Sequence, residues 1–461
     1  MSADPYLSIV VAARNDDHGG NLLGRMQAFV NALLDQCGEQ SLPAELIIVE
    51  WNPPAGRTRL ADALKWKPGP CEARIIEVPE ELHRRYAHAE SLPLYQMIAK
   101  NAGIRRARGE FVLATNIDIL FSNAMMELFA EKRLRKGVLY RVDRHDAEAE
   151  VPIGSSVEER LAYCETHRIR VNTRWGPVVL NPDAPRGVLE RRTELCLGAG
   201  WSSPEFGSLS RWAGDHAEIL LPEGIGGTLV LDLEPGPGVA WGPFTLVIEG
   251  VDEARIKRRS ILTIPITSDR LSFRVEGGGR IAGDDPRVLN FRALRCEVEN
   301  RQVEGVSVRP VENYLQAFRK RRPAPKDKKI LLPTLHIHAC GDFTLMAREH
   351  WFDLRGYAEF DMYSMNIDAL LCWAAHYRGL REQILRDPLR IYHIEHDAGS
   401  GWTPEGEEKL FTRLKQARLP WLDFTKLVEL VRAMRGSSEA AVLNEESWGL
   451  AADDLRETIP T

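Results

Sequence analysis

The chain has 461 residues, of which 44% are hydrophobic and 27% charged, and this ordinary globular composition argues against a largely disordered protein. Lys and Arg number 60 and Asp and Glu number 66, so the net charge of −6 does not favour a dedicated nucleic-acid-binding protein. At roughly 100–200 residues per domain, the length predicts two or three domains.

The start of the chain and its cysteines bear on location. Residues 1–5 are short and polar and show neither the basic nor the apolar region of a secretory signal. No apolar run reaches the ~18–20 residues of a membrane helix. Seven cysteines occur without a C-x-x-C pair, which predicts reduced thiols and neither a disulfide framework nor a zinc site. We therefore expect a cytoplasmic protein without a transmembrane segment.

Residues 1–145 alternate short apolar runs with amphipathic stretches. The patterns predict buried strands at 7–13, 46–49, 74–78 and 110–114, and helices at 22–34 and 93–107. Strands that alternate with helices predict a parallel sheet covered on both faces, whose ligands bind outside the carboxyl ends of the strands. The candidate residues at these ends are Arg14, Asn15, Glu50, Asn52, Asn116 and Asp118.

The pattern changes between about residues 187 and 300, where helical periodicity disappears. Short strand-like runs punctuated by Gly and Pro predict an all-β sandwich inserted into the α/β domain. The runs are 217–221, 228–233, 244–248, 260–266, 270–275 and 293–298.

A basic stretch at 319–329 follows the β-rich region. It is most simply a solvated linker, and peripheral contact with a membrane is the alternative. The α/β pattern then returns, with a helix predicted at 368–377, a strand at 389–394 and a helical tail after about residue 405. The expected organisation is an α/β domain at 1–180 and 335–410, an inserted β-sandwich at 187–305, a basic linker at 306–334 and a helical tail at 411–461.

Asn116 and Asp118 follow the strand predicted at 110–114. In an extended segment their side chains would lie on the same side, where two oxygen ligands suit Mg²⁺ or Mn²⁺. The alternative is a turn that closes the strand, since Asn and Asp are common turn residues.

His393 and His396 are three residues apart, a spacing that separates two imidazoles in an extended segment unless the strand ends between them. One imidazole could meet Asp118 across the fold as a metal ligand, and the alternative is a pair of surface or hydrogen-bonded histidines. Asp368, with Asp361 nearby, could deprotonate a hydroxyl nucleophile or simply begin the following helix.

The segment from Gly19 to Met26 has the glycine spacing of a phosphate-binding loop. Arg25 and Met26 stand where that loop requires Lys and then Ser or Thr, so a P-loop is not expected.

Taken together, these stretches resemble a family-2-type glycosyltransferase with a GT-A fold. The resemblance covers roughly residues 5–145 and 335–400 and leaves out the β-rich region. The stretches that carry it are 7–15, 45–52, 100–112, 116–118, 341–349, 355–359, Asp368 and 393–396. It implies a nucleotide-diphosphate sugar donor (UDP-, GDP- or dTDP-sugar), a glycan or lipid-linked acceptor and a divalent metal, Mn²⁺ or Mg²⁺.

The resemblance also implies roles for individual residues. The implied donor-binding residues are Ala13, Arg14, Asn15, Glu50, Lys100, Asn101, Asn116 and Asp118. Asp118 would bind the metal together with His396, or second His393, and Asn116 stands where the family has the first Asp of its D-x-D motif. Asp368 lies where the catalytic base falls, with Asp361 in reserve. Gly341, Asp342 and Glu359 would bind the acceptor.

Three tryptophans of the β-rich region, Trp201, Trp212 and Trp241, could stack on sugar rings, and the favoured alternative is that they fill its core or its contact with the catalytic domain. The resulting hypothesis is that the protein is an inverting, metal-dependent glycosyltransferase. The resemblance further implies that it acts in bacterial surface glycan synthesis. Two alternatives remain: a non-catalytic glycan-binding or scaffold protein on a degenerate transferase fold, and a sugar-phosphate nucleotidyltransferase.

Overall fold

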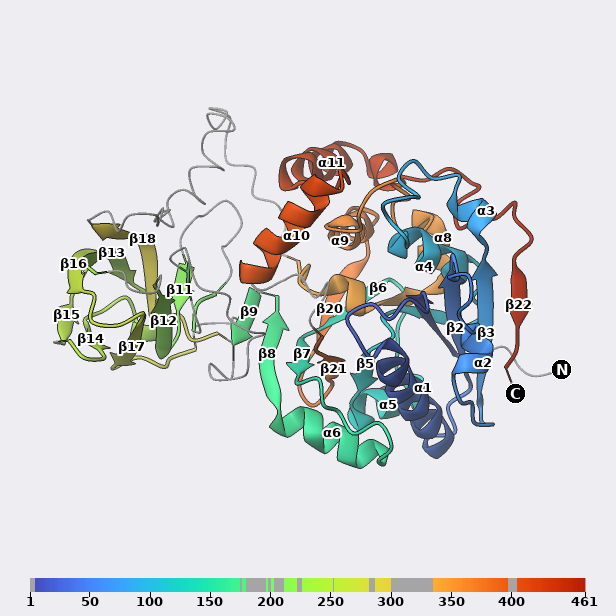
Figure 1. The fold of residues 1–461 in the computed structure, drawn as a ribbon, viewed down its shortest axis with the longest axis horizontal. Helices are drawn as coiled ribbons and strands as arrows, with labels where there is room; N and C mark the ends of the chain where they lie inside the picture. The colour runs from blue at the N-terminus through green and yellow to red at the C-terminus, as the bar shows by residue number, and fades with distance from the viewer. Residues whose placement is uncertain are drawn as a thin grey trace. The chain divides into compact units, whose positions relative to one another are not determined.

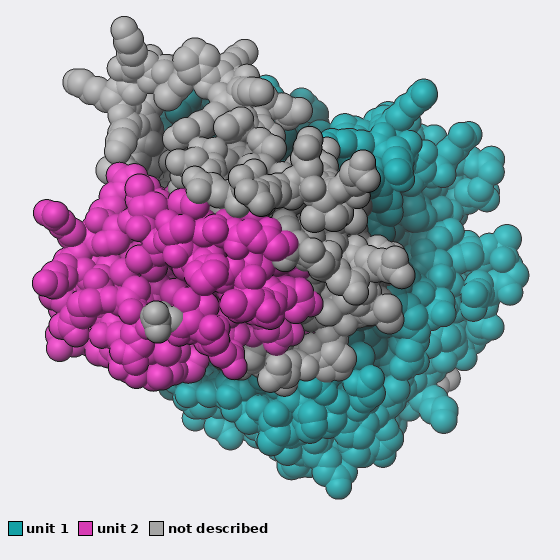
Figure 2. All heavy atoms as spheres, turned by 60° about the vertical axis from the view of Figure 1, so that its left-hand side comes forward, with its two compact units in different colours: residues 1–168, 335–461 teal, residues 169–334 magenta. Residues whose placement is uncertain are grey.

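The structure, a computed structural model, describes residues 5–174, 176–179, 196–197, 200–202, 211–221, 226–251, 253–281, 287–299, 335–396 and 404–460. The chain divides into two compact units (Figure 2). Unit 1 comprises residues 1–168 and 335–461, and unit 2 comprises 169–334. The stretch 306–334, expected to be a basic linker, with peripheral membrane contact through 319–329 as the alternative, lies outside the described residues.

Unit 1 contains a large mixed sheet (Figure 1). Its strands are β1 (Leu7–Ala13), β2 (Ala44–Trp51), β3 (Cys71–Val78), β4 (Phe111–Ala114), β6 (Val138–Val142), β19 (Thr344–Ala347), β20 (Arg381–Leu385) and β22 (Arg456–Thr458). They lie in the order β20-β6-β19-β4-β1-β2-β3-β22. Strands β4, β1, β2 and β3 are parallel, whereas β19 and β22 run antiparallel to their neighbours. The predicted α/β class is confirmed, and the sheet is mixed because segments from the end of the chain enter it in the opposite direction.

Helices surround the sheets of unit 1. The described α-helices are α1 (Leu22–Glu39), α2 (Leu60–Ala63), α3 (Glu80–His83), α4 (Gln96–Arg105), α5 (Asn123–Ala130), α6 (Val157–Thr166), α8 (Arg348–Leu354), α9 (Ile367–Tyr377), α10 (Pro404–Gln416) and α11 (Phe424–Gly436). The predicted helices at 22–34, 93–107 and 368–377 correspond to α1, α4 and α9.

Strands β1 and β2 are buried along their whole length because helices cover both faces of the sheet. Ile9 and Val11 share one apolar cluster with the apolar side of α1. On the other face, Gly103 of α4 lies so close to the strands that a Cβ added there would stand 2.6 Å from Val10 Cγ1 and 3.0 Å from Val49 Cγ2. The continuous apolar run in the sequence follows from this burial on both sides.

A second, smaller sheet of unit 1 contains β5 (Ile119–Phe121), β21 (Ile391–Ile394) and β7 (Arg144–Ala147). Strand β21 pairs antiparallel with β5 and parallel with β7. This sheet joins the turn after β4 to a segment more than 270 residues later in the chain, and it carries the candidate site described below.

The tail expected to be helical forms α10 and α11 but ends in a strand that sequence analysis did not predict. Strand β22 pairs with β3 at the edge of the large sheet (Figure 1). Arg74 of β3 donates two hydrogen bonds to Glu457 of β22, with Nε and Nη2 at 2.7 and 2.8 Å from the carboxylate oxygens. A short polar segment becomes a strand here because this ion pair and the open sheet edge hold it.

Unit 2 is built from antiparallel strands. Strand β8 (Arg168–Thr173) begins at the last residue of the first part of unit 1 and pairs antiparallel with β9 (Gly176–Val179). The strands of the two sheets of unit 2 are β10 (Cys196–Leu197), β11 (Arg211–Ala213), β12 (His216–Leu220), β13 (Thr228–Pro235), β14 (Phe244–Ile248), β15 (Ala254–Ile256), β16 (Ser260–Pro265), β17 (Arg270–Glu276) and β18 (Phe291–Glu299). One sheet has the order β10-β12-β17-β14-β15 and another the order β11-β18-β13-β16. Both contribute to one apolar cluster. All six strands expected between residues 217 and 298 are present.

Within the described part of the chain, none of the helices combines the length and the apolar character needed to cross a bilayer.

Candidate metal centre

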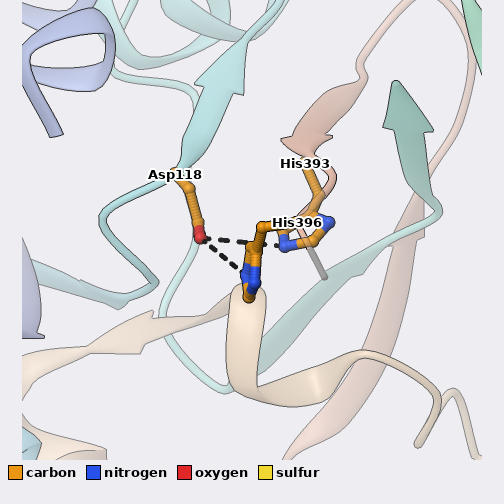
Figure 3. A group of neighbouring side chains, drawn as sticks. All are labelled: Asp118, His393 and His396. Atoms are coloured by element: carbon orange, nitrogen blue, oxygen red, sulfur yellow. Dashed lines mark ion pairs between the residues drawn. The ribbon is translucent and has the colours of Figure 1, made fainter. Parts of the chain in front are cut away.

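Three side chains from distant parts of the chain converge in unit 1 (Figure 3). Asp118 Oδ2 lies 3.3 Å from His396 Nε2 and 3.8 Å from His393 Nε2. The carboxylate points toward both imidazoles, and each residue offers a ligand atom within 4.8 Å of the others. The three residues therefore form a group that could hold one metal ion.

Pairing in the small sheet places these residues. His393 on β21 is opposite Ile119 on β5, directly after Asp118, and the backbone N–H of Ile394 donates to the Asp118 carbonyl at 3.0 Å. Strand β21 ends at Ile394, so His396 is not bound by the alternation of an extended segment. The strand ends between the two histidines, which is the condition under which sequence analysis allowed both to face one ion.

The spacing of the ligand atoms fits an ion. Bonds of about 2.0–2.2 Å place neighbouring ligand atoms about 2.8–3.1 Å apart in octahedral geometry and about 3.3–3.6 Å apart in tetrahedral geometry. The observed separations from Asp118 Oδ2, 3.3 and 3.8 Å, need only small side-chain shifts to meet these ranges. Two imidazoles and one carboxylate suit a transition metal better than Mg²⁺, which prefers oxygen ligands.

The second nitrogen of His393 faces another carboxylate. Nδ1 lies 3.6 Å from Oδ1 of Asp146, its partner in register on β7. Asp146 is fully buried and forms an ion pair with Arg144, whose Nε is 2.7 Å from Asp146 Oδ1. An outer carboxylate that orients a ligating imidazole is the usual companion of a metal-binding histidine. Asp146 and Glu395 also form a candidate group with His393, but the ion pair with Arg144 makes Asp146 better suited to the orienting role.

A positively charged side chain of α1, Arg25, lies beside the group of Asp118, His393 and His396. Arg25 is 5% exposed, its Nε lies 3.8 Å from Asp118 Oδ2, and its guanidinium donates to the carbonyls of His18 and Gly20. Gly19, with a φ of +72°, lies so close to the site that an added Cβ would stand 2.5 Å from His396 Nδ1. The glycines that imitate a phosphate-binding loop therefore allow the loop after β1 to pass against His396.

These charges act on Asp118. Burial by itself would raise the pKa of the Asp118 carboxyl, but the two imidazoles and the Arg25 guanidinium outweigh burial and hold that pKa well below its usual range. The carboxyl is therefore ionised at neutral pH, which is the state that binds a cation.

Asn116 does not join this group. Residues 117 and 118 form a turn, so the expected extended segment with Asn116 and Asp118 on the same side is wrong. Asn116 Oδ1 accepts from Lys100 Nζ at 2.8 Å and Nδ2 donates to Asp342 Oδ1. The Asn116 amide is thus engaged by protein groups.

Lys100 links two chain segments. Its fully buried Nζ donates to Asn116 and, at 2.7 Å, to the carbonyl of Gly341 in the 3₁₀ turn η2 (Cys340–Asp342). Burial lowers the pKa of Lys100 to about 8, although Asp342, Asp368 and Asp118 counteract this effect. Asp342 also accepts from Arg144, the partner of Asp146, so hydrogen bonds and ion pairs connect Lys100 to the surroundings of His393.

Asp368 lies in the first turn of α9, beside this network. Its Oδ2 would be 3.1 Å from a Cβ built on Gly341, and its Oδ1 accepts from the backbone N–H of Ala369 at 2.9 Å. Asp361, the reserve base, instead accepts from the backbone N–H of Ala87 at 3.0 Å. Of the two carboxylates, Asp368 is the one that adjoins Gly341 and Lys100.

The residues at the ends of β1 and β2 gather at one edge of the sheet. Ala13 is buried at the end of β1, Arg14 Nε donates to the Asn52 carbonyl at 2.8 Å, and Asn15 Nδ2 donates to the Thr58 carbonyl at 2.8 Å. Glu50 is 1% exposed and accepts from the Leu60 backbone N–H at 3.1 and 3.2 Å. Burial raises the pKa of Glu50 to about 7.

Two expected ligand-binding residues are engaged in packing. Asn101 Nδ2 donates to the Tyr357 carbonyl at 2.8 Å and to Glu359 Oε1 at 2.9 Å. Glu359 Oε1 also accepts from the Gly449 backbone N–H at 2.8 Å, and burial raises the pKa of Glu359. Asn101 therefore joins α4 to residues 357–359, and Glu359 joins that segment to Gly449.

The three tryptophans of unit 2 differ in exposure. Trp201 is 6% exposed, belongs to the apolar cluster and donates to the Glu218 carbonyl at 2.7 Å. Trp212 is equally buried, whereas Trp241 is 60% exposed. The core placement favoured from the sequence therefore describes Trp201 and Trp212, and only Trp241 offers a ring to solvent.

Sequence analysis missed Arg144, Asp146 and the proximity of Arg25 to Asp118. The missed signal is the charged run 143–146 directly after an apolar strand, in which Arg144 and Asp146 alternate. Three consecutive buried polar residues, Arg144, His145 and Asp146, form a strand only where they pair with one another or with a site.

Comparison with known proteins adds no family, because no family model and no curated protein matches the chain.

Two surface hollows of about 360 and 260 Å³ are lined by residues outside the candidate metal centre, among them Arg355 and Asn444 in the first and Lys136 and Arg348 in the second. The candidate site is therefore identified by its chemistry: a cation-binding group, a flanking arginine and a nearby carboxylate that could accept a proton.

Proposed function

We propose that the chain is a metal-dependent, inverting glycosyltransferase that moves a sugar from a nucleotide-diphosphate sugar to a hydroxyl of a glycan or lipid-linked acceptor in the cytoplasm. The observation that carries the proposal is the convergence of Asp118 with His393 and His396 directly after β4. Strand β4 is parallel to β1 and β2, and ligands of such sheets bind beyond the carboxyl ends of their strands.

The proposal includes a GT-A fold for unit 1 and a β-sandwich for unit 2. The parallel order β4-β1-β2-β3 supports the first, and two antiparallel sheets around one apolar cluster support the second.

Asp118, His393 and His396 would hold the cation, with Mn²⁺ preferred to Mg²⁺ because two of the three ligands are imidazoles. When bound, such a cation neutralises charge on the departing diphosphate. Arg25 adds a fixed positive charge 3.8 Å from Asp118, where it would favour the same anion. Asp146 would keep the His393 ring in its ligating orientation.

Asp368 would act as the base. Its Oδ1 is occupied by the Ala369 N–H, so the proton of the acceptor hydroxyl would be taken at Oδ2, next to Gly341. Lys100 holds the Gly341 carbonyl and Asn116 together, and so fixes the base relative to the turn that carries Asp118. Attack from the side opposite the diphosphate would invert the anomeric carbon.

The first test is a nucleotide-sugar panel. The full chain is incubated with UDP-, GDP- and dTDP-sugars and candidate glycan acceptors, with Mn²⁺ or with EDTA, and released nucleoside diphosphate is measured. We expect release from one donor class with Mn²⁺ only. Binding of a nucleoside diphosphate without turnover would support the scaffold alternative. A separate arm supplies nucleoside triphosphates and sugar 1-phosphates, and release of pyrophosphate in that arm would support a nucleotidyltransferase.

The second test separates binding from chemistry. Asp368→Asn should leave calorimetric binding of Mn²⁺ and nucleoside diphosphate unchanged and reduce transfer by at least about 100-fold. Asp361→Asn is the matched control and should retain transfer, because its carboxylate caps a loop at Ala87. Full transfer by Asp368→Asn would refute the base assignment.

A further inference from the structure

Unit 2 presents a large aromatic side chain in an unusual conformation. Trp241 is 60% exposed, and it and Ala240 have φ values of 56° and 55°, in the left-handed region that side chains other than glycine rarely adopt. Such a conformation is unfavourable for residues other than glycine and persists only where the surrounding structure imposes it. A strained backbone that holds a tryptophan in solvent directs attention to what the ring contacts.

The surrounding turn is firmly held. The N–H of Trp241 donates to the Gly236 carbonyl at 2.8 Å, and the N–H of Ala240 donates to the Pro237 carbonyl at 2.8 Å. The N–H of Gly238, in the 3₁₀ turn η1 (Pro237–Val239), donates to the Leu289 carbonyl at 2.8 Å. The exposed indole is therefore presented on a rigid support.

A second tryptophan, Trp212, lies between the exposed Trp241 ring and a pair of charged side chains. Trp212 is buried and lies edge to face with Trp241, with ring centroids 6.1 Å apart. The guanidinium carbon of Arg292 lies 5.2 Å from the centre of the Trp212 ring. Arg292 Nε donates to Glu234 Oε1 at 2.9 Å, and the two charged side chains are 30% and 25% exposed.

We infer that Trp241, supported by Trp212 on which the Arg292–Glu234 pair lies, forms a glycan-binding platform on unit 2. The open face of the Trp241 indole would stack on the apolar C–H face of a pyranose, and the planar Arg–Glu pair would exchange hydrogen bonds with sugar hydroxyls. This inference is independent of the proposed transferase activity, since binding requires no catalysis.

The neighbouring groups favour a glycan over other occupants. A membrane surface attracts several unpaired basic residues around an apolar anchor, whereas Arg292, the arginine that lies on Trp212, is paired with a carboxylate. A stable protein interface needs a broad buried patch, whereas this platform offers a single exposed ring. One aromatic ring beside paired donors and acceptors suits a ligand whose own surface alternates C–H faces and hydroxyls.

The test uses the full chain on an array of microbial and plant oligosaccharides, followed by titration of each bound glycan with tryptophan fluorescence as the readout. We expect at least one glycan to bind, and Trp241→Ala to weaken its binding at least tenfold without changing the unfolding midpoint, because the side chain is exposed. Ile261→Ala, which removes an apolar side chain of unit 2 that is 66% exposed, is the matched control and should bind normally.

Three results would overturn the inference. They are the absence of binding to every glycan on the array, binding that Trp241→Ala leaves intact, and Trp241-dependent flotation with phosphatidylglycerol vesicles in place of glycan binding. An Arg292→Met variant adds an independent check, since it should weaken the same glycan while stacking on Trp241 is retained. Loss of transfer activity with intact glycan binding would bear on the proposed function alone.

Discussion

Two buried glutamates on one strand should respond to pH in opposite ways. Glu50 lies at the carboxyl end of β2 and Glu45 near its start, and both are at most 1% exposed. Burial raises the pKa of Glu50 from 4.5 to about 7, with no cation bonded to its carboxylate among the described residues. We predict that Glu50→Gln makes unit 1 more stable at alkaline pH.

The sign follows from proton linkage. Between pH 4.5 and about 7 the native state holds a proton on Glu50 that the unfolded state has lost, so native stability falls as pH rises through this window. A pKa change from 4.5 to about 7 corresponds to about 3 kcal/mol at pH 8 and to almost nothing below pH 4.5. Glutamine retains an oxygen for the Leu60 N–H and removes this penalty.

Glu45 is the matched control. Burial by itself would raise the pKa of Glu45, but hydrogen bonds from Ser8, Arg108 and Arg74 outweigh burial and lower that pKa. Its ionised form therefore stabilises the native state above about pH 4.5, and this contribution is lost as pH falls through the lowered pKa. Glu45→Gln should be less stable than the wild type at pH 7, with a smaller deficit in acid.

The assay is urea unfolding of the full chain and both variants at several pH values between 4.5 and 8.5, analysed as differences from the wild type in the transition assigned to unit 1. The stability of Glu50→Gln relative to the wild type should rise with pH and level off near pH 8. A difference that stays constant across this range would refute the assignment of a protonated Glu50.

Further predictions concern the metal group and the core of unit 2. Asp118→Asn should weaken Mn²⁺ binding by at least about 100-fold in calorimetry, because it removes the only charged ligand of the group, and near-normal affinity would exclude this site. Gly19→Ala should weaken Mn²⁺ binding about tenfold by placing a methyl 2.5 Å from His396 Nδ1, and unchanged affinity together with unchanged stability would contradict that close approach. Trp201→Ala should cost about 3–5 kcal/mol in thermal unfolding of unit 2, and a loss below about 1 kcal/mol would contradict its core position.

The sequence predicted the elements with strong local patterns. Strand β1 begins and ends where its largely apolar run does, because a sheet covered on both faces favours apolar residues and buries a polar one such as Ser8 only with a hydrogen-bond partner, here Glu45. In unit 2, the alternation of Phe244–Ile248 matches a strand with one face in the core. The short strands β7 and β22 lack such a pattern, since ion pairs and a vacant sheet edge, both supplied by distant segments, hold them.

For the candidate site, the sequence by itself identified Asp118, His393, His396 and Asp368 as chemically capable residues. Only the tertiary structure decided which of them meet, because pairing of β5 with β21 closes more than 270 residues of chain between the carboxylate and the imidazoles. Contacts between distant segments likewise turned Asn116 toward Lys100 and, within unit 2, buried Trp201 and Trp212 while leaving Trp241 exposed. Side-chain chemistry is local to a residue, whereas the partner that gives it a role is fixed by contacts between distant segments.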